Sequence, residues 1–195
     1  MQARRSILCS MGLLLFLAGC GSSSTTTSVT TCTQQFWNGS VGVCLPSGWE
    51  EMNRERLDLL GVPPEAIVAF QTVKPVSGQF PNVILTAEPL TGVFTSPDYS
   101  KSSIRSVASL PGYQLVDVRA AIVDGKSVEI HIYTAQPAGD QPRVRFYQIS
   151  AVSGDGTTTG TGYTVTGFSP LSPTDTLDKQ FLLILKSLTF TEPKK

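Results

Sequence analysis

The single histidine of the chain lies in a segment where polar and apolar residues alternate. In an extended chain, residues 127–135 would place three polar side chains on one side: Glu129, His131 and Tyr133. A histidine beside a carboxylate is an arrangement that general-base catalysis uses. The segment therefore indicates either hydrolase or transferase chemistry at His131, with Glu129 as its partner, or a binding surface.

The next strand-like segment, residues 144–152, and the arginine before it repeat this alternation. If the two segments pair as a hairpin, six side chains are expected on adjacent rows of one sheet face: Glu129, His131, Tyr133, Arg143, Arg145 and Tyr147. Such a candidate binding face suits an anionic or sugar-like ligand, or a partner protein. The same alternation is typical of a solvated sheet face or of one covered by a helix, so both alternatives stay open.

Other motifs give little support to catalysis. The chain contains no Gly-x-Ser-x-Gly element, and the glycine-rich residues 154–162 lack the lysine of a phosphate-binding loop. With one histidine and no second cysteine pair, zinc is not favoured, and the aspartates do not have calcium-loop spacing. We expect no metal and no cofactor, and the balance favours a protein that is not an enzyme.

Strand-like runs separated by turn clusters dominate the chain, at residues 36–37, 41–45, 65–73, 82–88, 113–123, 127–135, 144–152 and 163–168. A helix is expected over residues 97–110 with Ser96 as N-cap, and Asp124-Gly125 predicts a hairpin turn. Thr174 or Asp175 should cap a final helix whose apolar stripe is Leu177, Phe181, Ile184, Leu185 and Leu188. This order predicts an α+β fold, a central antiparallel sheet with helices packed on its faces.

The N-terminal residues have the order of an export signal. Arg4 and Arg5 precede an apolar run, residues 7–17, that is too short to span a bilayer. The closing Leu17-Ala18-Gly19-Cys20 resembles a bacterial lipobox, and the resemblance implies cleavage before Cys20 and attachment of lipid to its thiol. An ordinary signal peptide in which Cys20 is incidental is the alternative.

Three parts follow from this interpretation: a signal peptide at residues 1–19, a lipidated cysteine with a Ser/Thr-rich tether at 20–33, and one folded domain at 34–193. After removal of the signal with Arg4 and Arg5, the net charge is about −2. Because no basic stripe occurs, we expect no nucleic-acid partner. The domain should face the periplasm or the cell exterior, held to a membrane by lipid.

Cys32 and Cys44 remain as an even pair in an exported chain, which predicts one disulfide. Asn38-Gly39 is a hairpin signal. With a three-residue loop at residues 37–39, Cys32 would lie directly opposite Cys44, within disulfide reach. A metal site or a reactive thiol is the alternative.

Several motifs occur in the order known from one family: Leu45-Pro46-Ser47-Gly48-Trp49, Pro81-Asn82-Val83-Ile84, Asp124-Gly125, Tyr163-Thr164-Val165-Thr166 and the apolar residues 181–188. Over residues 34–190 the chain is similar to the PsbP-like superfamily, including the small bacterial lipoproteins grouped with it. The resemblance implies an antiparallel sheet sandwiched by helices and an accessory or binding subunit rather than an enzyme. Trp49 is expected to cover one end of the core.

The sequence therefore predicts an envelope lipoprotein that acts as a non-catalytic binding or accessory subunit. Its partner would be an envelope protein or a small ligand. A hydrolase or transferase that uses His131 as general base is the alternative. The identity of the partner, the choice between inner and outer membrane, and the oligomeric state stay open.

Overall fold

The computed structural model of the chain describes residues 30–193, apart from residues 60, 61, 63, 138–140 and 155–156. The expected signal peptide and Cys20 lie outside the described residues. The described strands are β1 (Gln34–Trp37), β2 (Gly42–Leu45), β3 (Trp49–Glu51), β4 (Ala66–Thr72), β5 (Asn82–Pro89), β6 (Gln114–Val123), β7 (Lys126–Ala135), β8 (Val144–Val152) and β9 (Thr161–Ser169). The described helices are α1 (Arg54–Leu59), α2 (Ser96–Val107) and α3 (Asp175–Lys186).

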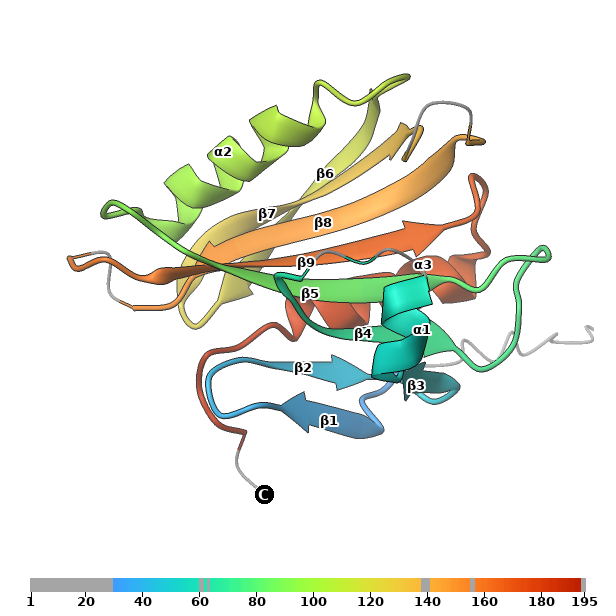
Figure 1. Cartoon of the computed structure of the whole chain (residues 1–195), viewed down its shortest axis with the longest axis horizontal. Coiled ribbons are helices and arrows are strands. Elements are labelled where there is room, and N and C mark those ends of the chain that lie inside the picture. Colours follow the sequence, from blue (N-terminus) through green and yellow to red (C-terminus); the bar gives the residue numbers. More distant parts are fainter. Residues whose placement is uncertain (1–29, 60–61, 63, 138–140, 155–156, 194–195) are drawn as a thin grey trace, which may run out of the picture.

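Seven of the described strands form one antiparallel sheet in the order β3-β4-β5-β9-β8-β7-β6, and β1 pairs with β2 in a separate hairpin. In Figure 1, α3 lies behind the sheet, whereas α1 and α2 lie in front of it. The α+β class and the antiparallel sheet are confirmed. The sequence did not predict the short strand β3 or the helix α1.

Local chemistry accounts for the ends of the helices. The Thr174 hydroxyl accepts a hydrogen bond from the Leu177 N–H at 3.2 Å, so the cap of α3 is confirmed. For α2 the predicted cap was wrong by one residue, because Thr95 and not Ser96 accepts from the Asp98 N–H. Ser96 is buried instead, and its hydroxyl accepts from the Val152 N–H at 3.0 Å. This hydrogen bond ties the start of α2 to the end of β8.

The sheet face beneath α3 carries the main core of the domain. The Phe181 ring of α3 stacks on Tyr147 with ring centroids 4.6 Å apart and meets Trp49 edge-on at 5.5 Å. A Cβ at Gly167 would come within 2.6 Å of the Phe181 ring, so this position needs glycine for the helix to approach the sheet. All five residues of the predicted α3 stripe are buried. The expected structural role of Trp49, which is 2% exposed, is confirmed.

The opposite sheet face is only partly covered, because α2 packs mainly on β7 and β8. At the C-terminal end of α2, a smaller apolar cluster contains Tyr133, Ala135 and Phe146, with Val107 and Leu110 packed against it. Beyond this cluster the face becomes polar on β8, β9 and β5. This change in side-chain chemistry creates the candidate site described below.

The predicted disulfide between Cys32 and Cys44 is confirmed, with their Cα atoms 5.6 Å apart. The predicted register of the hairpin is wrong, however, because Gln35 and not Cys32 lies opposite Cys44. The chain turns through residues 38–41, and the Asn38 carboxamide accepts the N–H groups of two of these residues at 3.0 Å. Cys32 still reaches its partner because the neighbouring Thr33 N–H donates to the Leu45 carbonyl, which keeps the chain beside β2.

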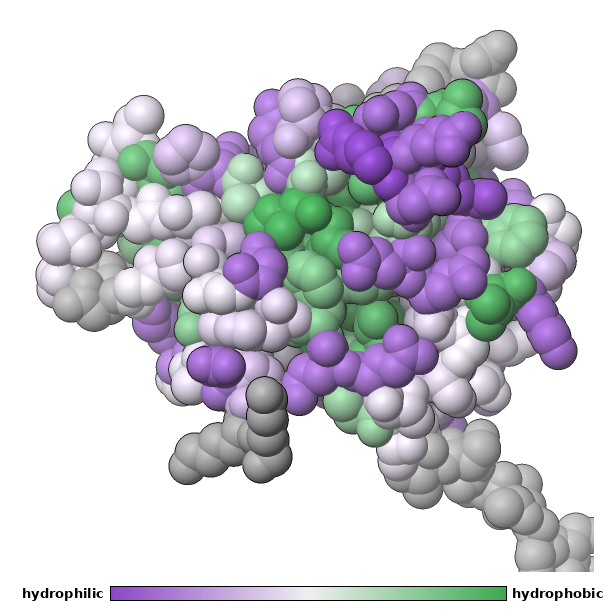
Figure 2. All heavy atoms as spheres, turned by 60° about the horizontal axis from the view of Figure 1, so that its bottom comes forward, coloured by the Kyte–Doolittle hydropathy of each residue, from purple (hydrophilic) through white to green (hydrophobic). Residues whose placement is uncertain are grey.

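The hairpin β1–β2 is joined to the domain through α3 and the residues after it. The Cys44 N–H donates to the Ser187 hydroxyl at 2.7 Å, and Gly42 exchanges backbone hydrogen bonds with Thr189. Figure 2 shows the side of the molecule at the bottom of Figure 1, where apolar side chains gather at the centre between hydrophilic ones. Within the described part of the chain, every helix is too short or too polar to cross a membrane.

Candidate functional site

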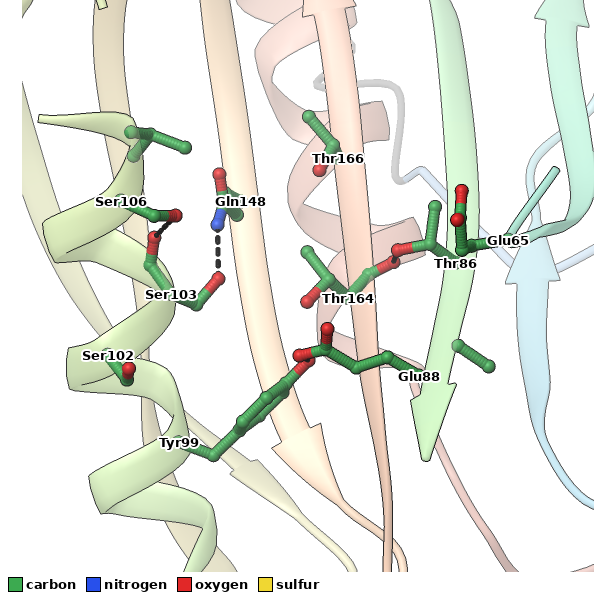
Figure 3. Close-up of a pocket in the computed structure, with 12 residues that line it drawn as sticks. Glu65, Thr86, Glu88, Tyr99, Ser102, Ser103, Ser106, Gln148, Thr164 and Thr166 are labelled. Carbon is green, nitrogen blue, oxygen red and sulfur yellow. Dashed lines mark hydrogen bonds between the residues drawn. The ribbon is translucent and has the colours of Figure 1, made fainter. Parts of the chain in front are cut away.

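A cleft of about 510 Å³ lies on the partly covered sheet face, beside α2. Its floor consists of side chains from β5, β8 and β9, and one wall is the side of α2 that faces them (Figure 3). The lining is Glu65, Thr86, Ala87, Glu88, Tyr99, Ser102, Ser103, Ser106, Val107, Gln148, Thr164 and Thr166. Most of these side chains carry hydroxyl, amide or carboxylate groups, so the cleft is polar although it lies against a sheet.

The register of the strands explains why polar side chains lie together in the floor of the cleft. Thr86 pairs with Thr164 across β5 and β9, and Gln148 pairs with Thr166 across β9 and β8. Directly opposed residues of antiparallel strands point to the same face, so these side chains line up across three strands. The alternate residues of the same strands, such as Val165 and Ile149, are fully buried in the core on the α3 side.

Gln148 joins the floor of the cleft to its wall. The carboxamide is 3% exposed; its oxygen accepts from the Tyr133 hydroxyl at 2.9 Å, and its nitrogen donates to the Ser103 hydroxyl at 2.7 Å. Ser150 also donates to Ser103, at 2.9 Å. This network fixes the position of α2 over the sheet, since a buried polar group is costly unless it is hydrogen-bonded.

Tyr99 closes one end of the cleft by reaching from α2 to β5 (Figure 3). Its hydroxyl donates to the Glu88 carboxylate at 2.8 Å. Burial raises the pKa of Tyr99 to about 12, and the neighbouring Glu88 acts in the same direction, so this phenol is neutral at physiological pH. A Cβ at Gly162 would lie 2.4 Å from the Tyr99 ring, so the ring rests directly on the β9 backbone.

Glu65 and Glu88 give the cleft its charge. Neither carboxylate forms an ion pair with any of the described residues, and no lysine or arginine is among the residues that line the cleft. Metal binding by the protein alone finds no support, because the described residues include no cluster of three or more potential ligands. The cleft therefore has an anionic, hydroxyl-rich lining.

The predicted candidate binding face is divided between the two sides of the sheet. Tyr133 pairs with Phe146, and Ile132 pairs with Tyr147. Odd-numbered residues of β7 therefore share a face with even-numbered residues of β8. The expectation that all six side chains lie on adjacent rows is wrong: Glu129, His131 and Tyr133 lie on the α2 side, whereas Arg143, Arg145 and Tyr147 lie on the α3 side.

On the α2 side, His131 is 9% exposed and its Nε2 lies 3.0 Å from a Glu129 oxygen. The contact between the two side chains is the one the sequence predicted. His131 Nδ1 has no hydrogen-bond partner among the described residues, and the ring does not line the cleft. Tyr133 is 1% exposed and stacks on Phe146 at 4.9 Å, so it belongs to the apolar cluster under α2.

On the α3 side, the three remaining side chains make structural contacts. Arg143 donates to the side chains of Gln114 and Thr134. Arg145 lies over the Tyr147 ring at 5.8 Å, and the Tyr147 hydroxyl donates to an Asp178 oxygen at 2.8 Å. The Tyr147 hydrogen bond joins the sheet to α3, whereas the contacts of Arg143 and Arg145 stay within the sheet. The binding role of the six residues stays a prediction.

Asp117 and Asp178 both contact the guanidinium of Arg119, at 2.8 and 3.1 Å. The hydrogen bond from Arg119 holds the pKa of the Asp117 carboxyl below its usual range. Asp117 also accepts the N–H of Val118 on the edge strand β6, at 2.8 Å. A charged side chain that occupies an edge N–H discourages pairing with another strand.

Sequence reasoning did not identify the cleft, although two signals pointed to it. Thr164 and Thr166 alternate with core residues on β9, as Gln148 and Ser150 do on β8. The predicted helix carries several serines on one side, among them Ser102, Ser103 and Ser106. A polar helix side above polar strand positions indicates a solvent-filled space rather than a packed interface.

The sequence matches no family model, and no curated protein matches it significantly. The structure is similar to that of LpqN, a protein involved in cell envelope biogenesis of Mycobacterium tuberculosis, with a TM-score of 0.58, 15% identity and coverage of 82% of this chain and 91% of that chain. It is also similar to cyanobacterial PsbP from Synechocystis sp. PCC 6803, with a TM-score of 0.50, 16% identity and coverage of 90% and 99%. The predicted resemblance is confirmed at the level of architecture. The described domain of this protein has the PsbP-like fold.

Proposed function

We propose that this protein is a lipid-anchored binding protein of the bacterial cell envelope that holds a small polar ligand in the cleft beside α2. The observation that carries the proposal is the cleft itself, about 510 Å³ of space lined by hydroxyls, an amide and two carboxylates. Small-molecule sites are concave, are largely formed before binding, and carry a few polar groups that fix the ligand.

A non-catalytic role fits the arrangement better than the hydrolase alternative. General-base catalysis needs substrate room next to the base. His131 is 9% exposed, and it does not line the cleft. The neutral Tyr99 and the hydrogen-bonded Gln148 hold the walls of the cleft in place, as a binding site requires.

The envelope location rests on the Leu17-Ala18-Gly19-Cys20 motif and gains support from the fold that the domain shares with the mycobacterial envelope protein. Expressed in a bacterium with lipoprotein processing, the mature protein should begin at Cys20, carry the mass of acyl chains and sediment with membranes. A Cys20→Ser variant should lose the acyl mass and leave the membrane fraction, because the Ser/Thr tether alone has little affinity for lipid. Intact-protein mass spectrometry and fractionation test both points.

A processed wild-type protein that retains residues 1–19, or that lacks acyl mass, would contradict the anchor. A Cys9→Ser variant is the matched control, because this cysteine lies within the expected signal and should leave processing unchanged. The anchor and the cleft are separate parts of the proposal, so either one can fail alone.

Filling the cleft tests the binding role. Ser106 is an exposed residue of α2 that lines the cleft, so a Ser106→Trp side chain should occupy the space without disturbing the core. The full chain is incubated with a metabolite extract of its source bacterium, washed by filtration, and analysed for bound small molecules by mass spectrometry. We expect wild-type protein to retain a polar compound that Ser106→Trp retains about tenfold less, a loss that corresponds to about 1.4 kcal/mol of binding free energy.

Ser109→Trp serves as the matched control, because Ser109 is exposed just beyond α2 and does not line the cleft. It should retain the compound at the wild-type level. Circular dichroism should show the same secondary structure in all three proteins. Equal retention by Ser106→Trp, or retention of nothing by the wild type, would contradict binding in this cleft.

A further inference from the structure

We propose that the ligand of the cleft is an organic cation that also carries hydroxyl groups, of the amino-sugar kind. This inference rests on the proposed function and adds the chemical class of the ligand.

The charge of the lining selects against anions and in favour of cations. Glu65 and Glu88 both lie at the cleft, and neither has a cationic partner within the described part of the chain. Two negative charges without a counterion favour a ligand that supplies a positive charge. The arginines expected to recognise an anion, Arg143 and Arg145, lie on the far side of the sheet and cannot reach the cleft.

Glu88 is already oriented for such a contact. Its Oε1 accepts from the Tyr99 hydroxyl, so the carboxylate is held at the end of the cleft while its Oε2 accepts no hydrogen bond from the described residues. A carboxylate oxygen that is positioned in advance binds an ammonium group at a lower cost in conformational entropy. The hydrogen bond would also be charge-assisted, which makes it stronger than one between neutral groups.

The floor of the cleft supplies groups suited to hydroxyls. Gln148 uses one of its two amide hydrogens on Ser103, and no second acceptor for this nitrogen exists among the described residues. Thr166 lies beside it across the sheet, and the hydroxyl of this threonine makes no hydrogen bond to any described residue. Hydroxyl and amide groups both donate and accept, which matches the hydroxyl groups of a polyol.

A bare divalent cation fits less well. Calcium takes six to eight oxygen ligands at close range, whereas the described residues that line this cleft include only two carboxylates. The described residues contain no cluster of three or more metal-ligating side chains. A space of about 510 Å³ is also far larger than one ion needs, and it suits a molecule of several ring atoms.

Three sugars that differ mainly in charge provide the test: the cation glucosamine, the neutral glucose and the anion of glucuronic acid. Each is added to the full chain in slightly acidic buffer, where the amine of glucosamine is protonated. Saturation-transfer NMR detects even weak binding through the signals of the sugar. We expect glucosamine to bind about tenfold more tightly than glucose, because a charged hydrogen bond is worth about one order of magnitude in affinity. Glucuronic acid should give no signal, because its carboxylate is repelled by the two glutamates. Added salt should weaken only glucosamine binding.

The double variant Glu65→Gln/Glu88→Gln keeps the size of both side chains and should remove the preference of about tenfold for glucosamine over glucose. Glu51→Gln is the matched control, because Glu51 is exposed on β3 and does not line the cleft. Three results would contradict an organic cation as the ligand without contradicting binding in the cleft. They are equal binding of glucose and glucosamine, stronger binding of glucuronic acid, and displacement of glucosamine by calcium. No signal from any sugar in the wild type would overturn this inference, and the extract experiment would then decide separately whether the cleft binds at all.

Discussion

A Phe181→Ala variant is expected to lose about 3–5 kcal/mol of its free energy of unfolding. The ring is 0% exposed, stacks on Tyr147 and meets Trp49 edge-on, so its removal leaves a cavity between α3 and the sheet. The cavity cannot collapse easily, because Gly167 and the strands beneath it are held by the sheet hydrogen bonds. Denaturant unfolding followed by circular dichroism measures the change.

Leu171→Ala is the control for this prediction. Leu171 is 49% exposed in the loop before α3, and its truncation should change stability by no more than about 0.5 kcal/mol. A loss below about 1.5 kcal/mol for Phe181→Ala would contradict the central position of this ring in the core. Should Phe181→Ala fail to fold, Phe181→Leu keeps the test open with an expected loss of about 1–2 kcal/mol.

Removal of the disulfide is expected to cost about 3 kcal/mol of stability. Cys32 and Cys44 are separated by 12 positions, and closing a loop of that size restricts the unfolded chain by about this amount in the chain-entropy model. The double variant Cys32→Ala/Cys44→Ala avoids free thiols and leaves the hairpin held only by noncovalent contacts with α3, the segment after it and the core. Its unfolding in denaturant is compared with that of the oxidised wild type.

Reduction of the wild type should reproduce the effect of the double variant, since both remove the same constraint. Hydrogen exchange should locate part of the loss in β2, whose residues contact α3 and the segment after it. Equal stability of the oxidised wild type and the double variant would show that the cross-link does not restrict the unfolded chain.

Local patterns were a good guide to the type and position of the main elements. The alternation in residues 127–135 placed His131 and Glu129 together on one side of β7, and the structure has their side chains in contact. Asp124 and Gly125 have φ values of 45° and 80°, as the predicted hairpin turn requires. Such features depend on neighbouring residues only, so they can be recognised from a short stretch of sequence.

The register between two strands that are joined by a longer connection could not be predicted from the sequence. Between β7 and β8 the register brings Tyr133 opposite Phe146, and a shift by one residue would have placed Tyr147 there instead. Since side chains alternate with a period of two, that one-residue difference decides which face Arg143 and Arg145 occupy. The register of the β1–β2 hairpin was also predicted wrongly, although the disulfide was correct, because the turn takes residues 38–41 and not the three residues expected.

The cleft depends on how far α2 extends over the sheet, which no single segment encodes. Tyr99 belongs to the predicted helix pattern, but its contact with Glu88 joins residues from two elements. Gly162 permits this contact because it has no side chain, and in the sequence it is one of several glycines near a turn. The two carboxylates of the site come from different strands of the sheet, since Glu65 directly precedes β4 and Glu88 lies in β5.

The amino-acid sequence alone determined the α+β class, the order of the longer helices and strands, and the partner of each cysteine in the disulfide, because hydrophobic period, turn residues and cysteine count act over short distances. It also predicts an export and lipid-attachment signal, because the Leu17-Ala18-Gly19-Cys20 motif is recognisable from the order of residues alone. Only the tertiary structure decided which polar residues share a face and where a cavity remains, since both depend on strand register and on the area that α2 covers. For this reason the candidate functional site depends on how the helices and strands pack together, and it could not be located from the sequence.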